Sequence, residues 1–196
     1  VAFACRRLCQ TRAKHDGVSQ KRPTKSVNLK SAIHNPKSEL GSPLAFEPIF
    51  MERMWGGRRL ESEFHKKLPP QKRIGESWEI VDRSEAQSVV AGGPLCGRTL
   101  HELWTQERDE IFGDVPDTQR FPLFIKILDA REKLSLQVHP PETVANRLGG
   151  EPKSEFWYVA AADPDAELFL GFREPITHDI FEERLRDGTV TDHIHR

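Results

Sequence analysis

The chain has 196 residues, a hydrophobic content of 37% and a formal net charge of −1, which fits one domain with an appendage. The charge is uneven, because residues 1–45 hold nine Lys and Arg against two acids, net +7, and residues 46–196 carry −8. An acidic body argues against a nucleic-acid binder, and no apolar run approaches the 18 residues or so of a membrane-spanning helix.

Residues 1–45 are expected to be a basic, disordered extension to a folded body over residues 46–196. The extension is rich in Ser, Lys and Asn and has no sustained hydrophobic period. A transit peptide and a fragment or mistranslated upstream sequence are the alternatives, and we rank disorder or artefact above targeting. Cys5 and Cys9 lie in the extension, so Cys96 is the only cysteine of the body. No disulfide framework can form there, which favours a reducing, cytoplasmic setting.

The body begins with a predicted edge strand over residues 46–50, which contains a proline. The sequence Trp55-Gly56-Gly57 follows and has the form of an aromatic at a turn, with glycines that supply positive φ. A second strand is predicted over residues 76–81, with residues 88–91 as its hairpin partner. Glu76 in that strand is either a surface acid or a pocket acid.

A helix is predicted over residues 99–108, because Thr99 and Glu102 have the spacing of a capping box. Residues 121–129 form the most apolar predicted strand, interrupted by Lys126. A lysine in such a strand usually extends its ammonium to water. The alternative, which the next motif favours, is a contact to a substrate or phosphate.

The central motif is the predicted strand over residues 134–139, which ends at Pro140. Alternation places Ser135, Gln137 and His139 on one face. An isolated Gln-x-His match is more often a half-buried strand with its polar face in water. Here a second strand-like run opens at Glu155, and an imidazole, an amide oxygen and a carboxylate together suit a divalent ion such as zinc.

The remaining predicted elements have no comparable cluster of polar side chains. A short helix or turn is expected over residues 143–148, strands over 155–160 and 167–172, an amphipathic helix over 177–186, and a further helix near Thr189. His193-x-His195 has the look of a ligand pair. Residues two apart do not share a helix face, however, so we treat this pair as a coincidence.

Several separated motifs, in order, resemble type I mannose-6-phosphate isomerase, a zinc-dependent cupin family. The resemblance runs over about residues 46–196. The motifs that carry it are Met54-Trp55-Gly56-Gly57, Gly75-Glu76-Ser77-Trp78-Glu79, Arg120-Phe121-Pro122-Leu123, Lys126, Ser135-x-Gln137-x-His139-Pro140 and Lys153-Ser154-Glu155. The resemblance implies a mainly β, cupin-like jelly roll with peripheral helices, incomplete at its C-terminal end. It implies an enzyme that interconverts mannose 6-phosphate and fructose 6-phosphate.

The resemblance also implies roles for individual residues. Zinc would be the cofactor, and a small sugar phosphate the substrate, with no nucleic-acid or membrane partner and an undetermined oligomeric state. The implied metal ligands are Gln137, His139 and Glu155; the implied catalytic residues are Lys153 and Glu76; the implied substrate contacts are Trp55, Lys126 and Ser135.

The sequence departs from the family in one respect. The family supplies a further histidine ligand, usually in a Gly-Thr-x-His-Ala context, and an active-site arginine, and neither has a counterpart here. The sequence therefore predicts weak zinc binding and poor activity for a truncated isomerase. Two alternatives stay open: a non-catalytic sugar-phosphate-binding module, and another metallo-cupin, which Gln137 disfavours.

Overall fold

The computed structural model describes residues 2–5 and 43–196. The strands are β1 (Ala2–Cys5), β2 (Ile49–Gly57), β3 (Ile74–Ile80), β4 (Asp82–Arg83), β5 (Ala86–Gln87), β6 (Ile125–Leu128) and β7 (Phe156–Val159). Within these residues they form a five-stranded sheet, ordered β2-β3-β6-β1-β7, and the small hairpin β4-β5. Every strand pairing is antiparallel, so the predicted antiparallel β architecture is confirmed.

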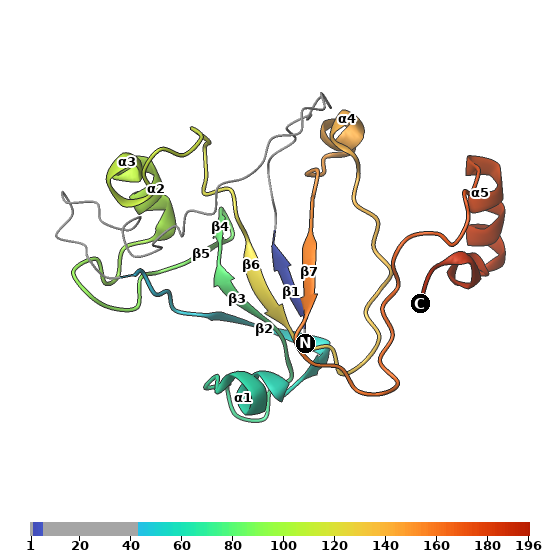
Figure 1. Cartoon of the computed structure of the whole chain (residues 1–196), viewed down its shortest axis with the longest axis horizontal. Coiled ribbons are helices and arrows are strands. Elements are labelled where there is room, and N and C mark those ends of the chain that lie inside the picture. The colour runs from blue at the N-terminus through green and yellow to red at the C-terminus, as the bar shows by residue number, and fades with distance from the viewer. Residues whose placement is uncertain (1, 6–42) are drawn as a thin grey trace, which may run out of the picture.

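Helices lie around this sheet rather than within it (Figure 1). They are α1 (Arg59–Phe64), α2 (Leu100–Gln106), α3 (Arg108–Ile111), α4 (Glu142–Ala145), α5 (His178–Asp187) and the 3₁₀ turns η2 (Asn146–Leu148) and η3 (Val190–His193). The two helices predicted over residues 99–108 and 177–186 are confirmed as α2 and α5. None of the described helices has the length and apolar character needed to cross a bilayer.

Backbone pairing of the first residues differs from the prediction. β1 pairs with β6 on one side and β7 on the other, so residues 2–5 are not the unpacked tail that was expected for the start of residues 1–45. A strand in this position supplies hydrogen-bond partners for two backbone ladders that would otherwise lie open. The rest of the predicted extension, residues 6–42, lies outside the described residues.

Close backbone approach explains the three glycines of the first motifs. A Cβ on Gly56 would lie 2.5 Å from the Gly75 nitrogen, and a Cβ on Gly75 would lie 2.6 Å from side-chain atoms of both Arg53 and Trp55. A Cβ on Gly57 would meet the Asp129 carboxylate at 2.8 Å. None of the three has positive φ. The prediction that Gly56 and Gly57 supply a positive-φ turn is therefore wrong, and they are needed for space.

The hydrophobic core lies between the sheet and the helices of residues 43–130. Leu60 of α1 packs with Leu68, Ile74 and Ile127. A second cluster surrounds α2, which has the predicted Thr99–Glu102 capping box. There Trp104 is buried and meets the rings of Phe112 and Phe121 edge-on or nearly so.

The hairpin predicted for the second strand forms only at its end, where the Ser88 amide donates a hydrogen bond of 2.8 Å to the Val81 carbonyl. β3 itself pairs with β2 and β6. Val89 and Val90 form isolated bridges with Thr99 and Phe46 instead. The short β4-β5 hairpin intervenes because the chain turns back at residues 84–85.

Residues 131–177 contain less regular structure than the sequence predicts. The segments 134–139 and 167–172 are not strands, although Phe172 forms an isolated bridge with Ile194. The apolar face predicted for the first of them is exposed, with Val138 at 82%. Alternation alone does not make a strand, because the backbone also needs a partner. The strand predicted over residues 155–160 is confirmed as β7.

Candidate active site

His139, Lys153 and Glu155 form one cluster of polar side chains. The Lys153 ammonium lies 3.3 Å from His139 Nε2 and 2.8 Å from Glu155 Oε1. His139 Nε2 and Glu155 Oε2 are 4.0 Å apart. The expected approach of the imidazole to the carboxylate is therefore present, although residues 134–139 are not a strand.

The Glu155 carboxyl has two opposing influences on its pKa. Burial is the largest and raises the pKa, but the hydrogen bond and charge of Lys153, the indole N–H of Trp157 and the nearby His139 together lower it below its usual value. The Trp157 contact measures 3.3 Å to Oε2. The carboxylate form is therefore favoured, which is the form that binds a metal ion.

Gln137 and Ser135 lie next to this cluster in sequence and bond to each other. The Gln137 amide donates a hydrogen bond to the Ser135 hydroxyl over 3.1 Å. Gln137 is exposed and His139 is half-buried. This bond uses the amide nitrogen of Gln137, so its carbonyl oxygen stays available as a ligand.

The donor types of this cluster suit a zinc ion. Tetrahedral zinc with bonds of about 2.0–2.2 Å holds its ligand atoms roughly 3.4 Å apart, so His139 Nε2 and Glu155 Oε2, which are 4.0 Å apart, would have to move slightly closer together. The Lys153 ammonium already lies close to both donors, which shows that the arrangement accommodates positive charge. Among the described residues, no group of three His, Cys, Asp or Glu side chains could hold a metal ion. Gln137 as a further ligand stays a prediction.

A second cluster surrounds Glu76, which is 8% exposed and therefore a buried acid rather than a surface one. The Trp78 indole donates to Glu76 Oε2 over 2.6 Å, and Arg53 Nε donates to Oε1 over 3.3 Å. Lys126 Nζ lies 3.8 Å from Oε2. Two hydrogen bonds and the nearby Lys126 ammonium fix the orientation of this carboxylate.

Lys126 connects the two clusters electrostatically. Burial has the largest effect on the pKa of its ammonium and lowers it; the charge of Glu76 opposes this shift, and that of Lys153 adds to it. The Lys126 side chain does not reach water freely, since only 17% of it is exposed. The usual extension of a lysine ammonium to water is therefore limited here, and the contact of Lys126 to a substrate or phosphate stays a prediction.

Trp55 contacts Gly75, the residue before Glu76, and the turn that follows β6. Its ring packs over the backbone of Gly75, and its carbonyl accepts hydrogen bonds from the amides of Arg131 and Glu132. Its predicted role as a wall of the sugar site stays a prediction. His193 and His195 are both exposed, and their interpretation as a coincidental pair also stays a prediction.

Two of the residues that hold the acids were missed by the sequence analysis. Trp78 follows Glu76 by two positions, and Trp157 follows Glu155 by two. In each case the indole N–H donates to the carboxylate. The spacing in the sequence could have predicted both contacts, since residues two apart in an extended chain share a face.

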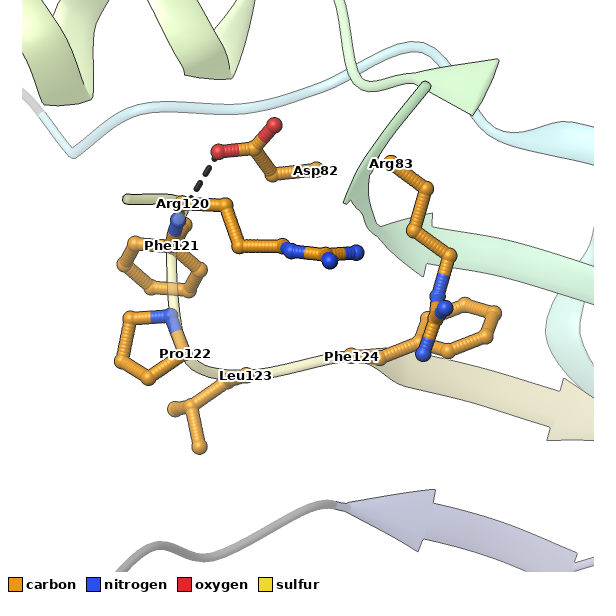
Figure 2. Close-up of a pocket in the computed structure, with 7 residues that line it drawn as sticks. All are labelled: Asp82, Arg83, Arg120, Phe121, Pro122, Leu123 and Phe124. Carbon is orange, nitrogen blue, oxygen red and sulfur yellow. Dashed lines mark hydrogen bonds between the residues drawn. The ribbon is translucent and has the colours of Figure 1, made fainter. Parts of the chain in front are cut away.

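A shallow surface hollow lies beside Asp82. Figure 2 shows its lining residues: Asp82, Arg83, Arg120, Phe121, Pro122, Leu123 and Phe124. The buried Asp82 carboxylate accepts a hydrogen bond of 2.8 Å from the Phe121 amide. The Phe124 ring connects the hollow to the Glu76 cluster, because Arg83 and Lys126 both lie over it, at 5.5 and 5.7 Å from its centre.

Comparison with known proteins assigns the family. Residues 44–166 match the model of the phosphomannose isomerase type I catalytic domain. The chain belongs to this family. The match covers every residue of both clusters. The region of the sequence that carried the resemblance therefore corresponds to the catalytic domain.

Individual relatives agree with this assignment. The chain is 42% identical over 148 residues to the probable mannose-6-phosphate isomerase GmuF of Bacillus subtilis, covering 74% of this chain and 46% of that protein. It is 44% identical over 131 residues to the mannose-6-phosphate isomerase ManA of the same organism, covering 66% and 40%. The chain thus spans less than half the length of these relatives.

A solved structure supports the fold. The crystal structure of the mannose 6-phosphate isomerase from Bacillus subtilis matches with a TM-score of 0.51 and 41% identity, covering 57% of this chain and 35% of that chain. Together with the antiparallel sheet and its outer helices, this match identifies the fold of the chain as a partial cupin-like fold, as predicted.

Proposed function

We propose that this phosphomannose isomerase family member interconverts mannose 6-phosphate and fructose 6-phosphate, with a zinc ion held by Gln137, His139 and Glu155. The observation that carries the proposal is the approach of His139, Lys153 and Glu155 within 4.0 Å, inside the region that matches the catalytic domain. The names of the relatives supply the substrate, a small sugar phosphate.

The reaction sets the chemical requirements. Aldose–ketose isomerisation moves a proton between C2 and C1 of the sugar through an enediol, so it needs a base near these carbons and stabilisation of the oxygen that gains charge. A bound zinc ion would polarise the carbonyl and hydroxyl oxygens as a Lewis acid. The side chains of the chain itself have to supply the base and orient the sugar.

Two residues are candidates for the proton-transfer group. Lys153 lies beside both His139 and Glu155, where an ammonium can stabilise an enediolate oxygen or pass a proton. Glu76 is a buried carboxylate with a fixed orientation. Lys126 beside it is a cation able to bind the substrate phosphate, and Ser135 and Trp55 are the further candidate substrate contacts.

The cellular setting is also proposed. The body contains one cysteine, Cys96, which is exposed and not in a disulfide. A reduced thiol at the surface is typical of a reducing compartment, which supports a cytoplasmic enzyme.

The test is turnover by the 196-residue chain with added zinc, followed by NMR of mannose 6-phosphate and fructose 6-phosphate. We expect slow, zinc-dependent turnover, since the family's further histidine ligand has no counterpart in the sequence. His139→Ala should abolish it. His193→Ala, at an exposed histidine outside both clusters, is the matched control and should leave it unchanged.

The same assay assigns the base. Lys153→Met and Glu76→Gln should each lower turnover, the one that removes the base by about 10²–10⁴-fold. Saturable binding of mannose 6-phosphate without any turnover would contradict the isomerase and favour the sugar-phosphate-binding module. Turnover that persists in His139→Ala would contradict the metal site.

A further inference from the structure

Glu151 bridges two arginines that come from distant parts of the chain. Its Oε2 accepts a hydrogen bond of 2.9 Å from Arg83 Nη1, and its Oε1 accepts one of 3.0 Å from Arg120 Nη2. Figure 2 shows both arginine side chains along the same hollow. We name this three-residue contact the Glu151 clasp.

The two arginines of the clasp are held in place by hydrogen bonds and packing. Arg83 ends β4, where its carbonyl accepts a hydrogen bond from Gln87, and its guanidinium lies over the Phe124 ring. Arg120 precedes Phe121, whose amide bonds to the buried Asp82 carboxylate. Asp82 is also the neighbour of Arg83 in sequence, so one buried carboxylate ties together both arginine-bearing segments.

The Glu151 side of the clasp stands on an irregular segment. Residues 150–155 form neither helix nor strand. The segment begins after Gly149, which has φ of +63° and ends η2, and Gly150, whose amide bonds to the Ala145 carbonyl. Beyond Gly150 the chain has no regular structure until β7 begins at Phe156, so side-chain contacts such as the clasp contribute to fixing the path of residues 151–155.

We propose that Glu151 is a positioning residue, whose clasp to Arg83 and Arg120 holds the segment that places Lys153 and Glu155 opposite His139. Lys153 is two residues beyond Glu151 and Glu155 is four beyond. Even a fully extended chain moves Glu155 only about 13 Å from the anchor. This inference rests on the proposed function, because the positioned residues are the candidate metal ligand and its lysine.

The size of the effect follows from the exposure of the clasp. Arg83, Arg120 and Glu151 have side chains 22%, 45% and 43% exposed, and exposed ion pairs contribute little to global stability. A reacting group displaced by about 1 Å can nevertheless cost about 10²-fold in rate. Breaking the clasp should therefore leave the melting temperature nearly unchanged and alter the metal site.

The experiment compares Glu151→Gln and Arg120→Gln with Glu85→Gln in the full chain. Glu85 is the matched control because it is an exposed acid that interacts electrostatically with Arg83 and Glu151, while its carboxylate accepts a hydrogen bond from the Ser84 hydroxyl. Three quantities are measured without substrate: amide hydrogen exchange of residues 150–156, zinc affinity by chelator competition, and the visible spectrum of the cobalt-substituted protein. The spectrum reports ligand geometry, which a merely structural role would not change.

We expect both clasp variants to exchange faster in this segment, to bind zinc about tenfold more weakly, as for residues that support a ligand, and to change the cobalt spectrum. The control should match the unaltered chain. Unchanged exchange, or faster exchange with unchanged zinc affinity and spectrum, would overturn the proposal. An unaltered chain that binds no metal would overturn both this proposal and the metal site, whereas one that binds metal without isomerising contradicts the proposed function alone.

Discussion

Residues 43–130 and residues 131–196 are packed very differently. Among the described residues, ten of the thirteen buried apolar side chains lie in the first region, and thirteen of the fourteen exposed large apolar side chains lie in the second. All four residues of β7 are exposed. We call these the packed region and the open region.

The candidate site takes one cluster from each region. Glu76 and Lys126 belong to the packed region, where the neighbouring strands β3 and β6 pair with each other. His139, Lys153 and Glu155 belong to the open region, on segments without regular pairing. The acid–lysine cluster is therefore fixed by the core, whereas the candidate ligands depend on a few side-chain contacts such as the Glu151 clasp.

The largest expected effect tests the packing difference itself. Leu60 has 0% exposure in the core of the packed region, and Leu170 of the open region is 70% exposed. Leu60→Ala should lower the free energy of unfolding by about 2–5 kcal/mol. Leu170→Ala should change it by no more than about 0.5 kcal/mol. Urea denaturation measures both, and equal losses would show that the open region is packed as tightly as the other.

A smaller loss of stability is expected when the close packing around Gly75 is disturbed. Gly75→Ala places a Cβ against Arg53 and Trp55 at 2.6 Å, and overpacking of this kind costs about 1–3 kcal/mol. The control is Gly92→Ala, because nothing lies within 4 Å of a Cβ there and its φ is not positive. The control should be neutral or slightly stabilising. Equal thermal stability of the two variants would remove the steric explanation.

The smallest effect concerns the pH dependence of stability. Burial lowers the pKa of Lys126 in the folded state from about 10.4 in the unfolded chain. The folded state then binds fewer protons than the unfolded state in the window between these values, so this lysine makes stability rise with pH there. Lys126→Met should lack that rise. Denaturation from neutral pH to about pH 10 tests this, and parallel curves for the two proteins would contradict the burial of the charge.

Local sequence signals predicted the elements that are fixed by local chemistry. The capping box at Thr99 begins a helix as expected, because a cap satisfies backbone donors of its own helix. The helix predicted over residues 177–186 from its apolar face is also present, and the Thr177 hydroxyl caps it. The prediction of a strand over residues 134–139 was wrong. A strand needs a neighbouring strand to pair with, and the alternation of apolar and polar residues does not show whether one is present. The turn predicted at Gly56 was wrong for a similar reason, because the residue that requires a glycine there is Gly75, on the neighbouring strand.

The residues of the candidate site also divide into those that local sequence signals predicted and those that they did not. Glu155 and His139 were found because their residue types and spacing fit a metal. Arg53 was not found, since it reaches Glu76 across strands and nothing local marks it. Glu151 was not found either, because its partners lie 68 and 31 residues away.

Zinc binding by the 196-residue chain tests the central claim most directly. Equilibrium dialysis against zinc compares the unaltered chain with His139→Ala and with the exposed control His193→Ala. The account predicts one zinc ion per chain, retained in the control and lost in His139→Ala, since that change removes the imidazole ligand beside Lys153 and Glu155. Equal zinc in all three proteins, or none in the unaltered chain, would contradict it.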